Sequence, residues 1–236
     1  MARRELHDEY FRKAKAEGYL ARSAYKLKEI QQKRRVMRSG GRALDLGCAP
    51  GAWLQVAAET VGPRGVVIGV DLKRVEATQP APVRAIQGDV HEIDPADLVE
   101  MAGGRFDTVL SDMAPSTSGA GDHFLSVRLC ERVLELAPAL LKPGGALVMK
   151  VLEGEQYPDL LRRMGAIFEQ CKGLKPAASR SVSSEMYIVG TGFRGAPTGE
   201  TPVPPGIRGG TPLAPPVPPQ AGWKPAPQGG RVGEQS

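Results

Sequence analysis

The sequence predicts an α/β protein in which a mostly parallel sheet carries helices on both faces. Three observations lead to this prediction. Short apolar runs of strand length recur along the chain, helical patterns alternate with several of them, and several runs end in Gly or Asp. Alternating strands and helices form parallel sheets, whose ligands gather at the carboxyl ends of the strands. We therefore expect the functional residues at that edge of the sheet.

Two helical stretches come first, at about residues 5–17 and 20–37. The second carries Leu20, Ala24, Leu27 and Ile30 at the spacing of one helix face. Aromatic side chains are interleaved with the basic residues of both stretches, and at helical spacing they suit packing at least as well as base stacking. Both stretches precede the first strand, so they form an N-terminal arm.

Six strand-like runs follow, at residues 43–47, 66–71, 83–88, 108–112, 146–151 and 185–190. The clearest helix between them begins at Asp122, a suitable N-cap, and keeps leucine and valine at helical spacing to Leu140. The breaker sequence Lys142-Pro-Gly-Gly then ends it. This order is the one expected for a parallel sheet.

The chain is long enough for one catalytic domain with appendages. With 236 residues, 41% of them hydrophobic, it can bury one good-sized core. We divide it into a basic helical arm (residues 1–40), a catalytic domain (residues 41–193) and a Pro/Gly-rich tail (residues 194–236). Eleven of the 21 prolines lie beyond residue 195, so we expect the tail to be disordered. Its proline clusters at 204–205 and 215–219 could alternatively serve as polyproline ligands.

Several protein classes are excluded by composition. No apolar stretch approaches the roughly 20 residues of a membrane helix, and the N-terminus is charged rather than signal-like. We expect a cytoplasmic protein without a membrane partner. The three cysteines are widely spaced and form no ligand pattern with the three histidines, which predicts neither disulfides nor a metal site. No heptad or exposed apolar repeat is present, so we expect a monomer.

Positive charge is concentrated at the N-terminus. Residues 1–42 contain 13 Lys and Arg but only five Asp and Glu, an excess of eight, whereas the whole chain carries +5. A basic arm ahead of a slightly acidic body suits a polyanion, most simply RNA held through phosphate contacts. A solvated surface would explain the basic run alone equally well.

The most informative motif is the run Ala43-Leu-Asp-Leu-Gly-Cys-Ala-Pro-Gly-Ala-Trp53. It predicts a strand that breaks at Gly47, turns through Pro50 and Gly51, and enters a helix. Glycine lets the backbone approach a ligand, and the helix N-terminus offers unpaired N–H groups to a carboxylate or phosphate. The dinucleotide pattern G-x-G-x-x-G is absent. Asp-Leu-Gly-x-x-Pro-Gly is instead the form that holds the amino-acid end of S-adenosylmethionine.

Two further carboxylates are predicted at the ends of the next strands. Asp71 follows an apolar strand and is placed to accept both ribose hydroxyls of a nucleoside, and Asp89 follows the next strand and is placed to accept from an adenine amine. Either residue alone could be a turn former or a helix cap. At three successive strand ends, counting the Gly47 turn, they predict a nucleoside pocket.

A carboxylate and an amine end two later strands side by side. Asp112 closes the run Val109-Leu-Ser, and Lys150 closes the run Leu147-Val-Met. A lone cation in an apolar strand is costly unless it is paired, so a plain structural ion pair is one interpretation. The other is catalytic, because burial and nearby cations favour the neutral amine, which can act as a base.

Together these motifs resemble the FtsJ-type ribose 2′-O-methyltransferases, most closely the bacterial branch that methylates uridine in large-subunit (23S) ribosomal RNA. That family carries a Lys-Asp-Lys-Glu catalytic set. The matching segments, over a resemblance that spans about residues 1–193, are Arg22-Ser-Ala-Tyr-Lys26-Leu, Ser111-Asp112-Met-Ala-Pro, Val148-Met-Lys150-Val and Ser183-Ser-Glu185-Met-Tyr-Ile-Val. All four residues are present in the family's order.

The resemblance implies a Rossmann-like S-adenosylmethionine-dependent methyltransferase fold with a seven-stranded, mostly parallel sheet. It implies a catalytic set of Lys26, Asp112, Lys150 and Glu185. It implies cofactor binding by Gly51, Trp53, Asp71, Asp89 and Asp112. The chain departs from the family at three places, where Cys48, Ala52 and Ser116 stand in positions that often hold Ala, Gly and Asn.

The function implied is methylation of a ribose 2′-hydroxyl in 23S ribosomal RNA, within the large ribosomal subunit. Lys150 would take the hydroxyl proton, Asp112 would orient its amine, and Glu185 would fix Lys26 and the ribose. Two alternatives stay open. The same set could methylate transfer RNA, a messenger cap or a small molecule, and the fold could serve a non-catalytic ribosome-assembly factor that only binds RNA.

Overall fold

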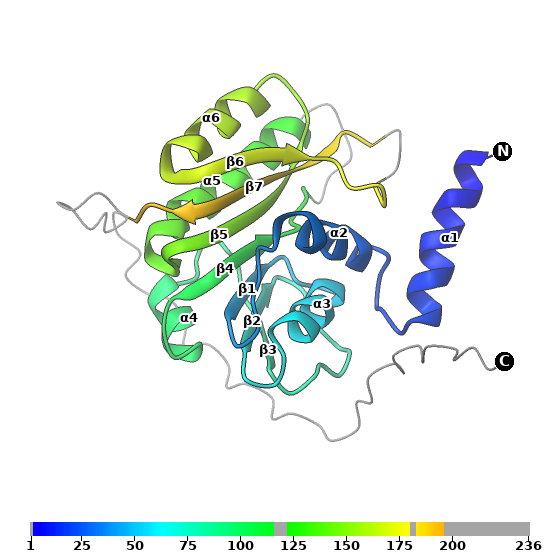
Figure 1. Ribbon diagram of the computed structural model, residues 1–236, viewed down its shortest axis with the longest axis horizontal. Coiled ribbons are helices and arrows are strands. Elements are labelled where there is room, and N and C mark those ends of the chain that lie inside the picture. The colour runs from blue at the N-terminus through cyan, green and yellow to red at the C-terminus, as the bar shows by residue number, and fades with distance from the viewer. Residues whose placement is uncertain (1, 116–121, 180–182, 196–236) are drawn as a thin grey trace, which may run out of the picture.

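One seven-stranded sheet organises the molecule, in the order β3-β2-β1-β4-β5-β7-β6 (Figure 1). The computed structural model describes residues 2–115, 122–179 and 183–195, and the side chains from residue 9 onward. The strands are β1 (Arg42–Leu46), β2 (Val66–Asp71), β3 (Val83–Gln87), β4 (Phe106–Ser111), β5 (Leu141–Leu152), β6 (Phe168–Leu174) and β7 (Glu185–Phe193). The predicted α/β class and seven-stranded, mostly parallel sheet are confirmed.

Strand direction divides the sheet into two parts. The first five strands pair in parallel, whereas β7 is antiparallel to both β5 and β6. Parallel strands end at one edge, so β1, β2, β3, β4 and β5 deliver their last residues there. Because β7 runs the other way, its first residue, Glu185, pairs with Leu152 at this same edge. The polar residues predicted at strand ends therefore meet on one side of the molecule.

Helices cover both faces of the sheet. Side chains of α2 (Ala24–Arg34) and α3 (Ala52–Val61) pack into one buried cluster with alternate residues of the strands. Side chains of α4 (Pro95–Met101), α5 (Asp122–Leu140) and α6 (Tyr157–Ile167) pack into a second cluster on the other face. Strand β1 shows the alternation, because Ala43 lies in the α2/α3 cluster while Leu44 and Leu46 lie in the other.

The N-terminal helix α1 (Ala2–Ala16) stands apart from the sheet and meets the body near its own C-terminal end (Figure 1). Its Ala14 packs in a small cluster with Tyr25 of α2 and Ala178 from the segment before β7, flanked by Tyr10 and Tyr19. The rings of Tyr10 and Tyr25 lie 5.5 Å apart, and those of Tyr19 and Tyr25 lie 5.9 Å apart. The three tyrosines of this region thus pack against one another, whereas Phe11 is exposed.

Several boundaries differ from the sequence-based prediction. Helix α2 is shorter than residues 20–37, because Arg35 adopts a left-handed conformation (φ 49°) that ends it. Strand β5 begins at Leu141, directly after α5 and earlier than the predicted residue 146. Strand β6 was missing from the predicted runs. The tail from residue 196 and the position of Ser116 lie outside the described residues.

Of the described helices, none combines the length and apolar character that crossing a bilayer requires.

Candidate active site

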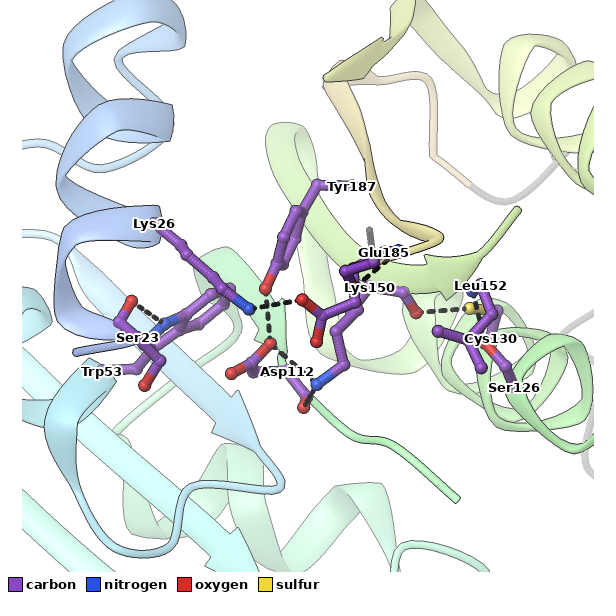
Figure 2. Close-up of polar contacts among 11 residues, drawn as sticks. Ser23, Lys26, Trp53, Asp112, Ser126, Cys130, Lys150, Leu152, Glu185 and Tyr187 are labelled. Atoms are coloured by element: carbon purple, nitrogen blue, oxygen red, sulfur yellow. Dashed lines mark hydrogen bonds and ion pairs between the residues drawn. The ribbon is translucent and has the colours of Figure 1, made fainter. Parts of the chain in front are cut away.

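The structure brings the four predicted catalytic side chains together on the α2/α3 side of the sheet (Figure 2). Lys26 comes from α2, Asp112 directly follows β4, Lys150 lies near the end of β5, and Glu185 begins β7. These residues are separated by up to 159 positions in sequence. The parallel strands and the antiparallel β7 are what place them at one edge.

Lys150 and Asp112 form the first of two lysine–carboxylate pairs. The Lys150 Nζ lies 3.0 Å from the Asp112 Oδ1 and also donates a hydrogen bond of 2.5 Å to the Asp112 main-chain oxygen. Only 8% of Lys150 is exposed. Two oxygens of one residue therefore hold the amine where β4 and β5 separate.

Lys26 and Glu185 form the second pair, with 2.9 Å between the Nζ and the Oε2. Lys26 is 5% exposed, although it lies in a helix rich in basic residues. Burial alone raises the pKa of Glu185, but attraction to Lys26, its hydrogen bond and the charge of Lys150 outweigh burial and leave this pKa below its usual range. Glu185 is thus held as a carboxylate by two lysines.

Tyr187 connects the two pairs and was missed in the sequence analysis. Its hydroxyl donates a 2.6 Å hydrogen bond to the Asp112 Oδ1, and the Lys26 Nζ lies 5.8 Å from the centre of its ring. Burial, followed by the negative charge of Asp112, raises the pKa of Tyr187 well above its usual value, so the hydroxyl remains a donor. The sequence did contain a signal for Tyr187. It lies two residues after Glu185, so both side chains point to the same face of the strand.

The glycine-rich turn is built as the motif predicted. Gly47 adopts φ 80°, and a Cβ added there would lie 2.4 Å from the Met113 Cγ, so only glycine fits. Gly51 has φ 112° and precedes the first residue of α3, Ala52. The turn therefore runs directly under the segment that follows β4.

A cavity of about 620 Å³ opens at this edge of the sheet. Asp71, Asp89 and Asp112 line it together with Gly47 and hydrophobic residues of α5. Gly51 and Trp53 are absent from the lining that the described residues provide. Trp53 is buried instead, where its Nε1 donates a 2.9 Å hydrogen bond to the Ser23 main-chain oxygen and its ring lies 5.8 Å from that of Tyr187.

Two of the cavity carboxylates also organise the backbone around them. Asp71 accepts hydrogen bonds from the main-chain N–H groups of Ala49 (2.9 Å) and Lys73 (2.8 Å). Asp89 accepts a 2.9 Å hydrogen bond from the N–H of His91. A carboxylate has about four acceptor positions, so both retain capacity for a ligand.

Two titratable groups beneath the turn are buried. Asp45 of β1 is fully buried, and neither of its oxygens has a hydrogen-bond partner among the described residues. Burial, with the nearby charges of Asp112 and Asp71, raises its pKa well above the usual value. Burial likewise raises the pKa of the Cys48 thiol. Cys48 thus suits a packing role better than that of a nucleophile.

A second cavity, of about 410 Å³, lies at the opposite end of β2 and β3 and is lined by Pro82, Arg84 and Met101 among others. It contains none of the predicted site residues. The 620 Å³ cavity is therefore the candidate cofactor site, because it adjoins the lysine–carboxylate pairs.

Comparison with known proteins identifies similar sequences. A protein named Ribosomal RNA large subunit methyltransferase E from Syntrophobacter fumaroxidans is 48% identical over 191 residues, covering 80% of this chain and 97% of that protein. The protein of the same name from Methanothrix thermoacetophila is 44% identical over 197 residues, covering 82% of this chain and 76% of its own.

A solved structure is also similar. It is described as a ribosomal RNA methyltransferase from Plasmodium falciparum and matches with a TM-score of 0.66 and 29% sequence identity, covering 75% of this chain and 100% of its own. The FtsJ-like methyltransferase family matches residues 19–193, a range that contains both lysine–carboxylate pairs and the whole sheet. This chain belongs to the FtsJ-like methyltransferase family.

Proposed function

We propose that this methyltransferase uses S-adenosylmethionine to methylate a ribose 2′-hydroxyl, of a uridine, in the 23S RNA of the large ribosomal subunit. The observation that supports the proposal best is the buried Lys150 amine, which Asp112 holds beside the cavity. The relatives named as large-subunit ribosomal RNA methyltransferases support the choice of RNA. We further infer that the protein acts as a monomer in the cytoplasm.

The residues around the cavity fit S-adenosylmethionine. Asp71 would accept from the ribose hydroxyls and Asp89 from the adenine amine, while Asp112 lies where the cavity meets the lysine. Gly51 and Trp53 would contribute through the helix N-terminus that they form rather than through their side chains. When bound, the cofactor supplies a methyl group activated by its positively charged sulfonium.

Lys150 is proposed as the general base. Its Nζ would accept the proton of the 2′-hydroxyl while that oxygen takes the methyl group, whose bond to the sulfonium sulfur would break and leave its electron pair on the sulfur. Asp112 orients the amine through two oxygens, and the Tyr187 hydroxyl in turn fixes the Asp112 carboxylate. General-base catalysis contributes about 10²–10⁴-fold, and positioning of the reactants can contribute more.

Lys26 and Glu185 are proposed to hold the target ribose. They are joined by their own 2.9 Å ion pair, and the Lys26 Nζ lies 5.8 Å from the centre of the Tyr187 ring. This division assigns the chemistry to one pair and substrate placement to the other.

The basic arm, residues 1–40, is proposed to bind RNA through its phosphates as well as to supply Lys26. Its exposed lysines include Lys13, Lys15 and Lys33. Lys13 also lies over the Tyr25 ring, 5.1 Å from its centre, so the cluster that seats α1 contains one of these cations. Phosphate contacts of this kind would make RNA affinity fall steeply with salt.

The test is transfer of a labelled methyl group from S-adenosylmethionine to undermethylated large ribosomal subunits, their free RNA and bulk transfer RNA. We expect label at one ribose of the large-subunit RNA with the wild type and none with Lys150→Ala. Label on transfer RNA alone would change the substrate and keep the chemistry. No label on any RNA, with cofactor bound, would instead favour a non-catalytic assembly factor.

A further inference from the structure

The end of β5 has a sheet partner on only one side. Strand β4 pairs with β5 up to the Ser111–Met149 register and then leaves the sheet. On the other side, β7 remains paired with β5 up to Leu152. The three residues of β5 from Lys150 to Leu152 therefore lie beyond the last residue of β4, at the place where the catalytic amine is attached.

Beyond the end of β4, side chains of α5 form hydrogen bonds with the main chain of β5 (Figure 2). Cys130 donates from its Sγ to the Lys150 main-chain oxygen over 3.1 Å, and Ser126 accepts through its Oγ from the Leu152 N–H at 2.8 Å. Main-chain groups two residues apart point to the same side of a strand, which is why two side chains four apart on one helix can reach both. We call Ser126 and Cys130 the α5 latch.

The two side chains of the α5 latch are buried and lie outside the lining of the described cofactor cavity. Both residues are 2% exposed, and neither side chain lines the 620 Å³ cavity. A buried carbonyl or N–H that loses its partner costs about 1–3 kcal/mol. The cost is avoided only while the main chain of β5 stays at the position where the latch can reach it, so the latch holds the Lys150 backbone in place.

The same helix also forms a wall of the cofactor cavity. Leu125, Arg128 and Leu129 line the cavity, whereas Ser126 and Cys130 are their immediate neighbours in sequence and face the strand. Two successive turns of one helix therefore contact both the cavity and the main chain of the strand that carries Lys150.

We propose that Ser126 and Cys130 are positioning residues for Lys150: they replace β4 as the hydrogen-bond partner of β5 and set the amine relative to the cofactor cavity. The inference rests on the proposed role of Lys150 as the base. It explains how β4 can leave the sheet and make room for ligands without releasing the strand that carries the amine.

The test compares Cys130→Ala with Cys130→Ser, which are similar in size but differ in the donor. Ser126→Ala removes the second contact, and Cys171→Ala is a control, since Cys171 lies on β6 away from Lys150. We expect the Ser126→Ala/Cys130→Ala double variant to lower kcat for methyl transfer by about 10–100-fold, the scale of a small misplacement. The Kd for S-adenosylmethionine and the KM for RNA should change less than about twofold, and Cys130→Ser should restore most of kcat.

A kcat equal to wild type in the folded double variant would overturn the inference while leaving the proposed function intact. So would a Cys130→Ser variant as slow as Cys130→Ala. If the wild type methylates no RNA, the proposed function fails. Hydrogen exchange at the Leu152 amide then tests separately whether the α5 latch holds the main chain of β5. Faster exchange in Ser126→Ala than in wild type would support it, and unchanged exchange would overturn it.

Discussion

The two lysine–carboxylate pairs look alike in composition but differ in how they are held. Lys150 and Asp112 come from adjacent parallel strands, and the amine contacts both a side-chain and a main-chain oxygen. Lys26 and Glu185 come from a helix and an antiparallel strand and share one contact. Asp112 lines the cavity, whereas Lys26 and Glu185 do not.

This difference is the basis for proposing different functions, proton transfer and ribose placement, for two ion pairs of the same kind. The Lys150 pair is fixed at the end of the sheet core by the strand, by the Tyr187 hydroxyl and by the backbone. The carboxylates of the two pairs are similarly exposed, 23% for Glu185 and 18% for Asp112, so the pairs differ in the number of contacts that hold each amine and not in exposure. The larger number of contacts at Lys150 suits proton transfer, which needs rigid placement.

Replacing each lysine by methionine gives the largest expected contrast. Lys150→Met should reduce kcat by about 10²–10⁴-fold with little change in cofactor Kd, because the proposed base is lost. Lys26→Met should lower kcat less, by about 10-fold, and raise the KM for RNA. Both constants are obtained from methyl transfer at varied RNA concentration.

A matched control comes from another lysine of β5. Lys142→Met changes the strand at its far end, where Lys142 pairs with Asp107. It should retain kcat within about twofold, because Lys142 lies at the opposite end of β5 from Lys150. Equal losses from Lys26→Met and Lys150→Met would remove the distinction between the two pairs.

Tyr187→Phe should have a smaller effect, because it removes only the hydroxyl that joins Tyr187 to Asp112. A hydrogen bond to a charged group contributes about 1.5–3 kcal/mol to stability, so the variant should lose several degrees in Tm. Asp112 keeps its contact with Lys150, so kcat should fall by only about 3–30-fold, less than the effect of a misplacement of about 1 Å. Tyr157→Phe on α6 serves as the control. A kcat unchanged in Tyr187→Phe would show that Asp112 needs no support beyond Lys150.

The smallest expected effect is the pH dependence of the Lys26–Glu185 pair. The pKa of Glu185 is lower in the folded state than its ordinary value of 4.5, so the pair stabilises the fold above the ordinary pKa. That stability is lost as the pH falls through the lowered value. The Tm of the wild type should therefore fall more steeply below about pH 4.5 than that of Glu185→Gln, since the variant cannot titrate. Parallel curves would mean that the pair adds no stability.

Much of the fold and site could be predicted because its signals are local. The glycine turn, the strands with Asp71 and Asp112 at their ends, and the lysine in an apolar strand are each visible within a few residues. Strand β6 was missed because its sequence, Phe-Glu-Gln-Cys-Lys-Gly-Leu, is polar and only its two end residues are buried. An edge strand of this kind has no apolar alternation to detect.

Other parts of the site depend on contacts that no local pattern shows. Lys26 was predicted to be catalytic only from the family resemblance. Its burial depends on contact with β7, which begins 159 positions later in sequence, so no local pattern around Lys26 indicates it. In the sequence, Ser126 and Cys130 are ordinary small residues of a helix. Their contacts with β5 become visible only in the structure, where β4 ends before β5 does. These roles arise from tertiary packing, which a single sequence does not display.

The reversed direction of β7 also sets where the described part of the chain ends. Glu185 lies at the edge of the sheet that holds the two pairs, and Phe193 lies roughly 27 Å along the strand, at 3.4 Å per residue. Residue 195 therefore lies beside Pro143, at the opposite edge of the sheet from Lys26 and Lys150. Any change of sequence after this point is attached to the sheet at the end away from the proposed reacting groups.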